Sequence, residues 1–220
     1  MSDFQYRNLG SCWEETLKSI DRFGGEVEDL VIERAATQDE VQQVESNLGH
    51  RLPESFRRML TGFSKSVEMT WSLPEELELA DPFSEIFRGN IHWSLDQLEK
   101  LESARQDWIR ECFPNPSDPY DRVWHNKLVF YEIENGDFIS LDLSATHHGE
   151  VVYLSHDDGQ GHGVRLAKSF DDFIHSWSML AGVGGEDWQW LPFYDPQNAC
   201  LDYSGEHAMK FRKIIGLTLR

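Results

Sequence analysis

Residues 128–143 read LVFYEIENGDFISLDL, and this stretch decides the fold. Two runs rich in β-branched and aromatic residues flank Glu134-Asn135-Gly136, and Asn-Gly is the dipeptide that tight hairpin turns prefer. Successive side chains of a strand point to opposite faces of its sheet. In the second run one face is aliphatic and the other is mixed, namely Ile139, Leu141 and Leu143 against Phe138, Ser140 and Asp142. The pattern predicts an antiparallel β-hairpin.

Further strand-like runs at residues 150–156 and 163–166 extend the hairpin into a meander. Helix-start signals surround it, because three capping boxes pair Thr37 with Glu40, Ser94 with Gln97 and Ser169 with Asp172. Helices are also expected over residues 11–23 and after Pro53, whereas residues 67–90 predict only a short strand near 67–71. We therefore predict an α+β fold, an antiparallel meander with helices packed on one side.

The chain divides into three expected parts around this meander. Residues 1–36 form an N-terminal helical extension, residues 37–183 form the α+β domain, and residues 184–220 form an aromatic and basic extension packed on the same domain. The last stretch, KFRKIIGLTLR at 210–220, is expected to be an extra edge strand or an interaction segment.

Charge is the strongest signal in the composition. The 220 residues include 39 acids against 20 Lys and Arg, which gives a net charge of −19. Such a surface repels nucleic acid and anionic lipid and attracts basic proteins, although acidity can also serve solubility alone. The three cysteines lie far apart, no signal peptide is recognisable, and no apolar run is long enough for a membrane span. We expect a cytoplasmic protein with no membrane or nucleic-acid partner.

The stretch HHGEVVYLSHDDGQGHG at residues 147–163 raises the question of a metal or phosphate site. His147 and His148 are neighbours that point apart in an extended chain, but His156 and His162 could meet across the turn with Asp158 between them. The glycines lack the phosphate-binding spacing, because Val164 stands where a small residue is needed. The favoured interpretation is a strand end followed by a solvated turn, with no metal and no cofactor.

Four stretches, taken in order, resemble the SUKH superfamily: GHRLPESFRRML at 49–60, LVFYEIENGDFISLDL at 128–143, GEVVYLSHDD at 149–158 and LAKSFDDFIHSW at 166–177. The resemblance covers about residues 37–180 and implies an α+β fold with a mixed or antiparallel sheet flanked by helices. It departs from the family pattern at TGFSKSVEM, residues 61–69, and finds no counterpart for residues 108–122 or the chain beyond 184. It also implies a non-catalytic binding module, similar in role to immunity proteins that neutralise a bacterial toxin, frequently a nuclease. The yeast branch of the superfamily instead includes a cell-wall-assembly regulator linked to killer-toxin resistance.

The leading hypothesis is therefore an immunity-type protein, not an enzyme, that occludes a basic partner. Acids around the meander and tryptophans in the tail are the expected contacts: Glu132, Glu134, Asp137, Asp157, Asp158, Glu186, Asp187, Trp188 and Trp190. The two tryptophans could instead clamp the tail onto the domain. An intracellular regulator of cell-wall or stress signalling and a metal-dependent hydrolase using His156, Asp158 and His162 are the alternatives, and the oligomeric state stays open.

Overall fold

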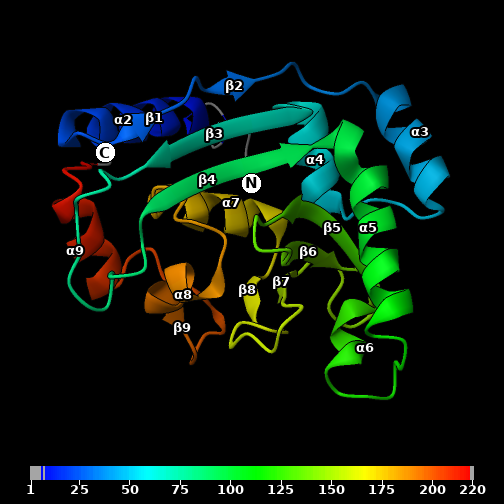
Figure 1. The fold of residues 1–220 in the computed structure, drawn as a ribbon. Coiled ribbons are helices and arrows are strands. Elements are labelled where there is room, and N and C mark those ends of the chain that lie inside the picture. The colour runs from blue at the N-terminus through cyan, green and yellow to red at the C-terminus, as the bar shows by residue number, and fades with distance from the viewer. Residues whose placement is uncertain (1–5, 7, 219–220) are drawn as a thin grey trace.

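A computed structural model describes residue 6 and residues 8–218 (Figure 1). The predicted meander is present as a four-stranded antiparallel sheet in chain order. Its strands are β5 (Lys127–Glu132), β6 (Phe138–Asp142), β7 (Val151–Leu154) and β8 (Arg165–Ala167). The prediction of an α+β fold is confirmed.

A second antiparallel sheet is built on β3 (Ser66–Ser72). β4 (Arg88–Ser94) pairs with β3 along its whole length, and the short strands β1 (Glu26–Val27) and β2 (Val31–Ile32) share the opposite edge of β3. The short strand predicted near residues 67–71 is β3 without its two terminal residues, whereas β4 was missed. Its letters RGNIHWS begin with a charge and a glycine, so the apolar alternation is confined to Ile91 and Trp93.

Helices surround the two sheets. The longer ones are α2 (Leu9–Phe23), α3 (Gln38–Leu48), α4 (Glu54–Gly62), α5 (Leu98–Glu111), α7 (Phe170–Met179) and α9 (Glu206–Ile214). The short elements are η1 (Leu95–Gln97), α6 (Asp121–Trp124), α8 (Asp187–Trp190), η2 (Leu191–Phe193), β9 (Tyr194–Asp195) and β10 (Cys200–Leu201). The C-terminal extension therefore contains a helix over 206–214, and the expected edge strand over its basic end is wrong for these residues.

The helices predicted to start after Thr37, Ser94 and Ser169 are all present, and two of the three starts are capped by the predicted side chain. The Thr37 hydroxyl accepts a hydrogen bond from the Glu40 N–H at 3.2 Å, with the Glu40 carboxylate returning to the Thr37 N–H at 2.8 Å. Ser169 accepts from the Asp172 N–H at 3.1 Å. The box at Ser94 is wrong, because a 3₁₀ turn precedes α5 and the Ser94 side chain makes no capping bond within the described chain.

One large core lies between the inner faces of both sheets and helices α2, α4 and α7. It includes buried tryptophans of both extensions, of the β3–β4 pair and of α7, at positions 13, 71, 93, 177 and 190. A smaller cluster covers the other face of the meander, where Leu101, Phe113 and Trp124 pack on strand residues such as Phe138 and Val152. The structure thus adds a second covering layer, α5 to α6, to the helices expected on one side of the meander.

Candidate functional site

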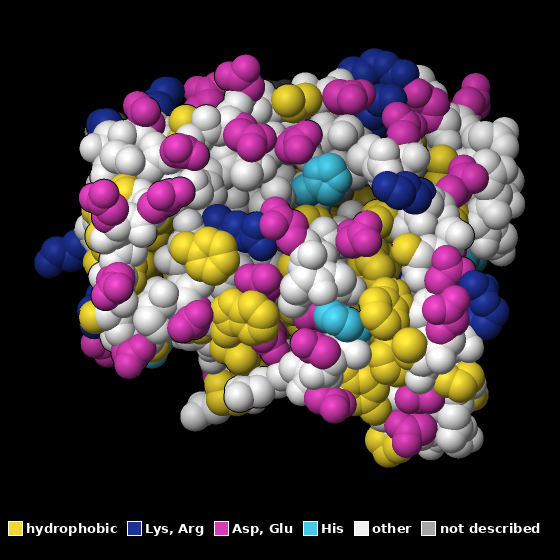
Figure 2. Space-filling model, in the orientation of Figure 1, with side chains coloured by type: hydrophobic (Ala, Val, Ile, Leu, Met, Phe, Trp, Pro, Cys, Tyr) yellow, Lys and Arg dark blue, Asp and Glu magenta, His cyan; other side chains and the backbone are white. Residues whose placement is uncertain are grey.

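The β3–β4 pair leaves one face of its sheet open. Val67, Met69 and Trp71 on β3 point into the core, and the residues that alternate with them, Glu68 and Thr70, point outward. Directly across on β4 lie His92, opposite Glu68, and Asn90, opposite Thr70. Figure 2, drawn in the same orientation as Figure 1, shows acidic side chains spread over the visible surface with hydrophobic ones among them.

Arg88 joins this sheet to the meander and to the C-terminal extension. Its guanidinium forms an ion pair with Glu134 of the hairpin turn and lies 3.7 Å from the carboxylate of Glu186. It also stands over the Phe87 ring at 5.3 Å from the centroid. Burial raises the pKa of Glu186, and the charge of Arg88 opposes that shift. The cation is therefore shared by two acids from distant parts of the chain.

Two large aromatic side chains stand exposed beside this ion group, Phe87 next to Arg88 and Trp188 next to Glu186. Phe87 is 49% exposed and Trp188 is 42% exposed. The loop that leads into α8, the helix that carries Trp188, is held against the start of β4, since the Gly184 N–H donates to the Arg88 carbonyl at 2.9 Å. We call the surface made by Glu68, Phe87, Arg88, His92, Glu134 and Trp188 the open face. It combines two exposed aromatic side chains with two carboxylates and one guanidinium.

His92 is the titratable group at the centre of the open face. Burial lowers its pKa, and the charge of Glu68 opposite raises it in part. Its ring lies 6.1 Å from that of Tyr131 on the neighbouring strand β5, and burial raises the pKa of Tyr131. Both groups are therefore held in their neutral forms near pH 7, and the charge of the open face comes from its carboxylates and Arg88.

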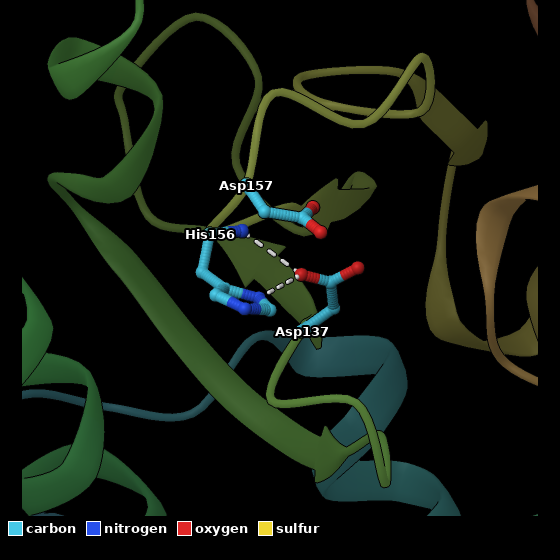
Figure 3. Close-up of side chains that lie close together, drawn as sticks. All are labelled: Asp137, His156 and Asp157. Carbon is cyan, nitrogen blue, oxygen red and sulfur yellow. Dashed lines mark hydrogen bonds and ion pairs between the residues drawn. The ribbon is translucent and has the colours of Figure 1, made fainter.

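The histidine-rich stretch is organised around the buried carboxylate of Asp137, which is 2% exposed (Figure 3). Its Oδ1 accepts from the His156 backbone N–H at 2.8 Å and lies 2.7 Å from His156 Nδ1. Its Oδ2 accepts from the Tyr153 hydroxyl at 2.6 Å and from Asn135 Nδ2 at 2.9 Å. Because a carboxylate only accepts, the Nδ1 atom of His156 carries a proton and donates it.

Asp137, His156 and Asp157 are the described residues that come closest to a metal-binding set, with ligand atoms within 4.8 Å of one another. Each Asp137 oxygen, however, already faces two donors of the chain, and Asp157 Oδ1 accepts from the Ser155 hydroxyl at 2.9 Å. A cation would have to displace the proton on His156 and break these bonds. The cluster is therefore a structural staple that holds the hairpin turn against the end of β7.

The hydrolase alternative required His156, Asp158 and His162 to converge, and the described chain does not bring these three together. Both ring nitrogens of His162 are engaged, because Nδ1 accepts from the Ser155 N–H and Nε2 donates to the Tyr120 carbonyl, each at 3.0 Å. Its ring also stacks on Tyr120 with centroids 3.7 Å apart. His162 is therefore a packing residue with no free ligand atom.

The glycines of the same stretch serve close packing. A Cβ on Gly159 would lie 2.7 Å from the Ser155 hydroxyl oxygen, and one on Gly161 would lie 2.6 Å from the Trp190 ring. The Gly161 N–H donates to the carboxylate of Asp187 at 2.7 Å. The loop thus lies directly against α8, and the sequence GQGHG reflects that contact and not phosphate binding.

The structure buries four of the nine predicted contact residues: Asp137 at 2% exposed, Glu186 at 8%, Asp187 at 4% and Trp190 at 0%. Asp187 holds Gly161 as described, and the Trp190 ring packs on Tyr153 at 5.3 Å. These four are withdrawn as contacts, because each is used inside the protein. The other five, Glu132, Glu134, Asp157, Asp158 and Trp188, are exposed and stay predictions.

Sequence reasoning missed Phe87, Arg88 and His92 because it missed β4. The available signal was the spacing of Ile91 and Trp93, which places them on one face of a strand. It would have turned Asn90 and His92 outward.

A family model described as the SMI1 / KNR4 family (SUKH-1) matches residues 35–176. The chain belongs to the SMI1/KNR4 family. The match confirms the SUKH resemblance and spans β3 to β8, so that Phe87, Arg88 and Glu134 of the open face lie inside the SMI1/KNR4 region. Trp188 and the strands β1 and β2 lie outside it. No curated protein matches this SMI1/KNR4 chain, and none of its described helices is both long and apolar enough to cross a bilayer.

Proposed function

We propose that this chain is a non-catalytic immunity protein that binds a basic bacterial toxin domain through the open face. One observation carries the proposal: two exposed aromatic side chains, Phe87 and Trp188, lie beside the ion group of Arg88, Glu134 and Glu186 at one end of the β3–β4 pair. Aromatic residues of this kind are enriched at the energetic centres of protein interfaces. Family membership supports a binding role.

The mechanism is steering followed by occlusion. A net charge of −19 attracts a cationic surface over a distance set by ionic strength and raises the association rate. Exposed carboxylates such as Glu68 and Glu134 then occupy positions that the phosphates of a nucleic-acid substrate would take in the toxin. Trp188 and Phe87 bury apolar area in the complex and slow dissociation. The toxin is blocked because its cleft is filled.

The test first searches the genes that neighbour this one for a toxin-like domain, which is then purified as an inactive variant. We expect its association rate to fall at least about tenfold between low salt and about 150 mM salt, since steering is screened over the Debye length. We expect Trp188→Ala to weaken binding by about 2 kcal/mol, or about thirtyfold.

Met209→Ala is the matched control, because Met209 is 55% exposed but lies on α9, outside the open face. It should bind like the wild type. A toxin-like domain that the wild-type protein fails to bind, or an association rate that ignores salt, would contradict the proposal. Equal effects of the two alanine variants would show that the open face is not the contact.

A further inference from the structure

The N-terminal extension supplies one edge of the second sheet. Residues 26–33 run antiparallel to β3 on the side opposite β4, with Glu26 across from Ser72 and Ile32 across from Val67. Figure 1 shows β2 at the upper margin of the molecule and β1 beside α2, and no further strand pairs with them in the described chain. This segment is therefore a free sheet edge.

A β-bulge divides the edge into two halves. Val27 lies across from Trp71 and Val31 lies across from Glu68, so the edge advances by four residues where β3 advances by three. The extra residue falls at Asp29–Leu30. The bulge shifts by one residue the alternation between residues whose backbone groups face β3 and residues whose groups face away. The segments before and after it therefore both stay hydrogen-bonded to β3.

The backbone of Val27 and Ile32 is available to a partner. The Glu28 N–H donates to the Thr70 carbonyl at 3.1 Å, and the Glu33 N–H donates to the Ser66 carbonyl at 3.0 Å. Neighbouring residues of an antiparallel strand direct their N–H and C=O groups to opposite sides. The polar backbone groups of Val27 and Ile32 therefore point away from β3, towards solvent.

The side chains of the edge define the chemistry of its occupant. Val27, Val31 and Ile32 are 39%, 45% and 39% exposed, which is unusual for aliphatic residues of a sheet. Four acids accompany them at positions 26, 28, 29 and 33, and of these only Glu33 has an ion-pair partner within the described residues, Lys65 at 3.4 Å. A second copy of this chain would bring like charges together at such an edge. A segment that alternates basic and apolar residues complements it.

We propose that an extended basic segment of the partner adds to this edge as a further β-strand, bonding to the backbone of Val27 and Ile32. The proposal rests on the proposed function and adds its mode of recognition. Glu26 and Arg88 both face Ser72 in register, so the edge and the open face lie two strand spacings apart, roughly 10 Å. One partner can therefore contact both. Residues 26–33 precede the family match at 35–176, so this mode of binding uses a segment outside the matched region.

The edge is tested with a defined probe, an octapeptide of alternating Lys and Val, against the double variant Val27→Pro/Ile32→Pro. Proline removes only N–H groups that face solvent here, so the sheet should tolerate it. The matched control Val27→Thr/Ile32→Thr keeps the N–H groups and the β-branched shape. We expect the proline variant to bind the peptide at least about tenfold more weakly, with the threonine variant within about threefold of wild type.

Hydrogen exchange on the wild type keeps the test decisive even if the proline variant does not fold. Bound peptide should slow exchange of the Val27 and Ile32 amides, and binding without that protection overturns the proposal. A wild-type dimer that the proline variant loses would assign the edge to a second copy and also overturn it. If the toxin-like domain binds the proline variant normally but does not bind the Trp188→Ala variant, the proposal of strand addition at the edge is refuted and the proposed function stands. If the peptide protects both amides while that domain does not bind at all, the edge stands and the proposed function fails.

Discussion

The Asp137→Asn variant distinguishes two roles for Asp137, a structural hydrogen-bond acceptor and a metal ligand. The side chain is 2% exposed and faces four donor atoms, from Asn135, Tyr153 and the backbone and ring of His156. Asparagine keeps the shape but presents an NH₂ group where one carboxylate oxygen accepted, so two donors lose their acceptor. Hydrogen bonds to a charged group contribute about 1.5–3 kcal/mol each, and partial reorganisation leaves a net loss of about 2–4 kcal/mol. For a chain of this length, that loss lowers the melting temperature by about 4–16 °C.

Urea titration at neutral pH measures the free energy of unfolding of each variant. Melting temperatures with and without added zinc or manganese complete the assay. A staple predicts the loss above and no effect of either metal on the wild type. A metal site predicts a wild-type melting temperature that rises with metal concentration, by mass action, and an Asp137→Asn variant that does not respond. Asp157→Asn is the control, because Asp157 is exposed and holds only Ser155 and should change stability by less than about 0.5 kcal/mol. If Asp137→Asn lowered the free energy of unfolding by less than about 1 kcal/mol, the structural role of Asp137 would be refuted.

Three further predictions follow from the same loop and from the cysteines. Burial lowers the pKa of His162 below its ordinary value of about 6.5, so the unfolded chain binds a proton that the folded chain does not. The free energy of unfolding should therefore fall as the pH drops through about 6.5. His162→Gln should flatten this pH dependence in urea titrations. Gly161→Ala should cost about 1–3 kcal/mol by denaturant unfolding, because its Cβ would meet the Trp190 ring at 2.6 Å. Burial raises the pKa of Cys12 to about 11, so iodoacetamide followed by mass spectrometry should modify the exposed Cys112 well before Cys12.

Local signals predicted the elements that local chemistry determines. The Asn135-Gly136 turn and the Thr37–Glu40 box depend on neighbouring residues alone, and both were predictable from the sequence. β4 was not, because its place depends on β3 and on core contacts of Ile91 and Trp93 made far away in sequence. Tertiary pairing overrode a weak local pattern there.

Exposure was the quantity that the sequence could not supply for the site. Trp188 and Trp190 look alike as letters beside acids, but one is 42% exposed and the other is fully buried. The same holds for acids, since Glu134 reaches solvent and Asp137, three positions later, is enclosed by hydrogen bonds. Net charge therefore predicts a basic partner, and the fold determines which carboxylates are exposed to solvent.

The pairing of β3 with chain from before the family region has a consequence for relatives of this protein. A homologue whose chain started near position 35 would border its sheet with β3 itself, and the alternation of Val67, Met69 and Trp71 would run along its rim. The segment before position 35 therefore determines which strand forms the exposed edge of the sheet. Exchanging this segment between relatives would change which partners can bind at the sheet edge and would leave the shared core unchanged. One fold could acquire different binding specificities in this way.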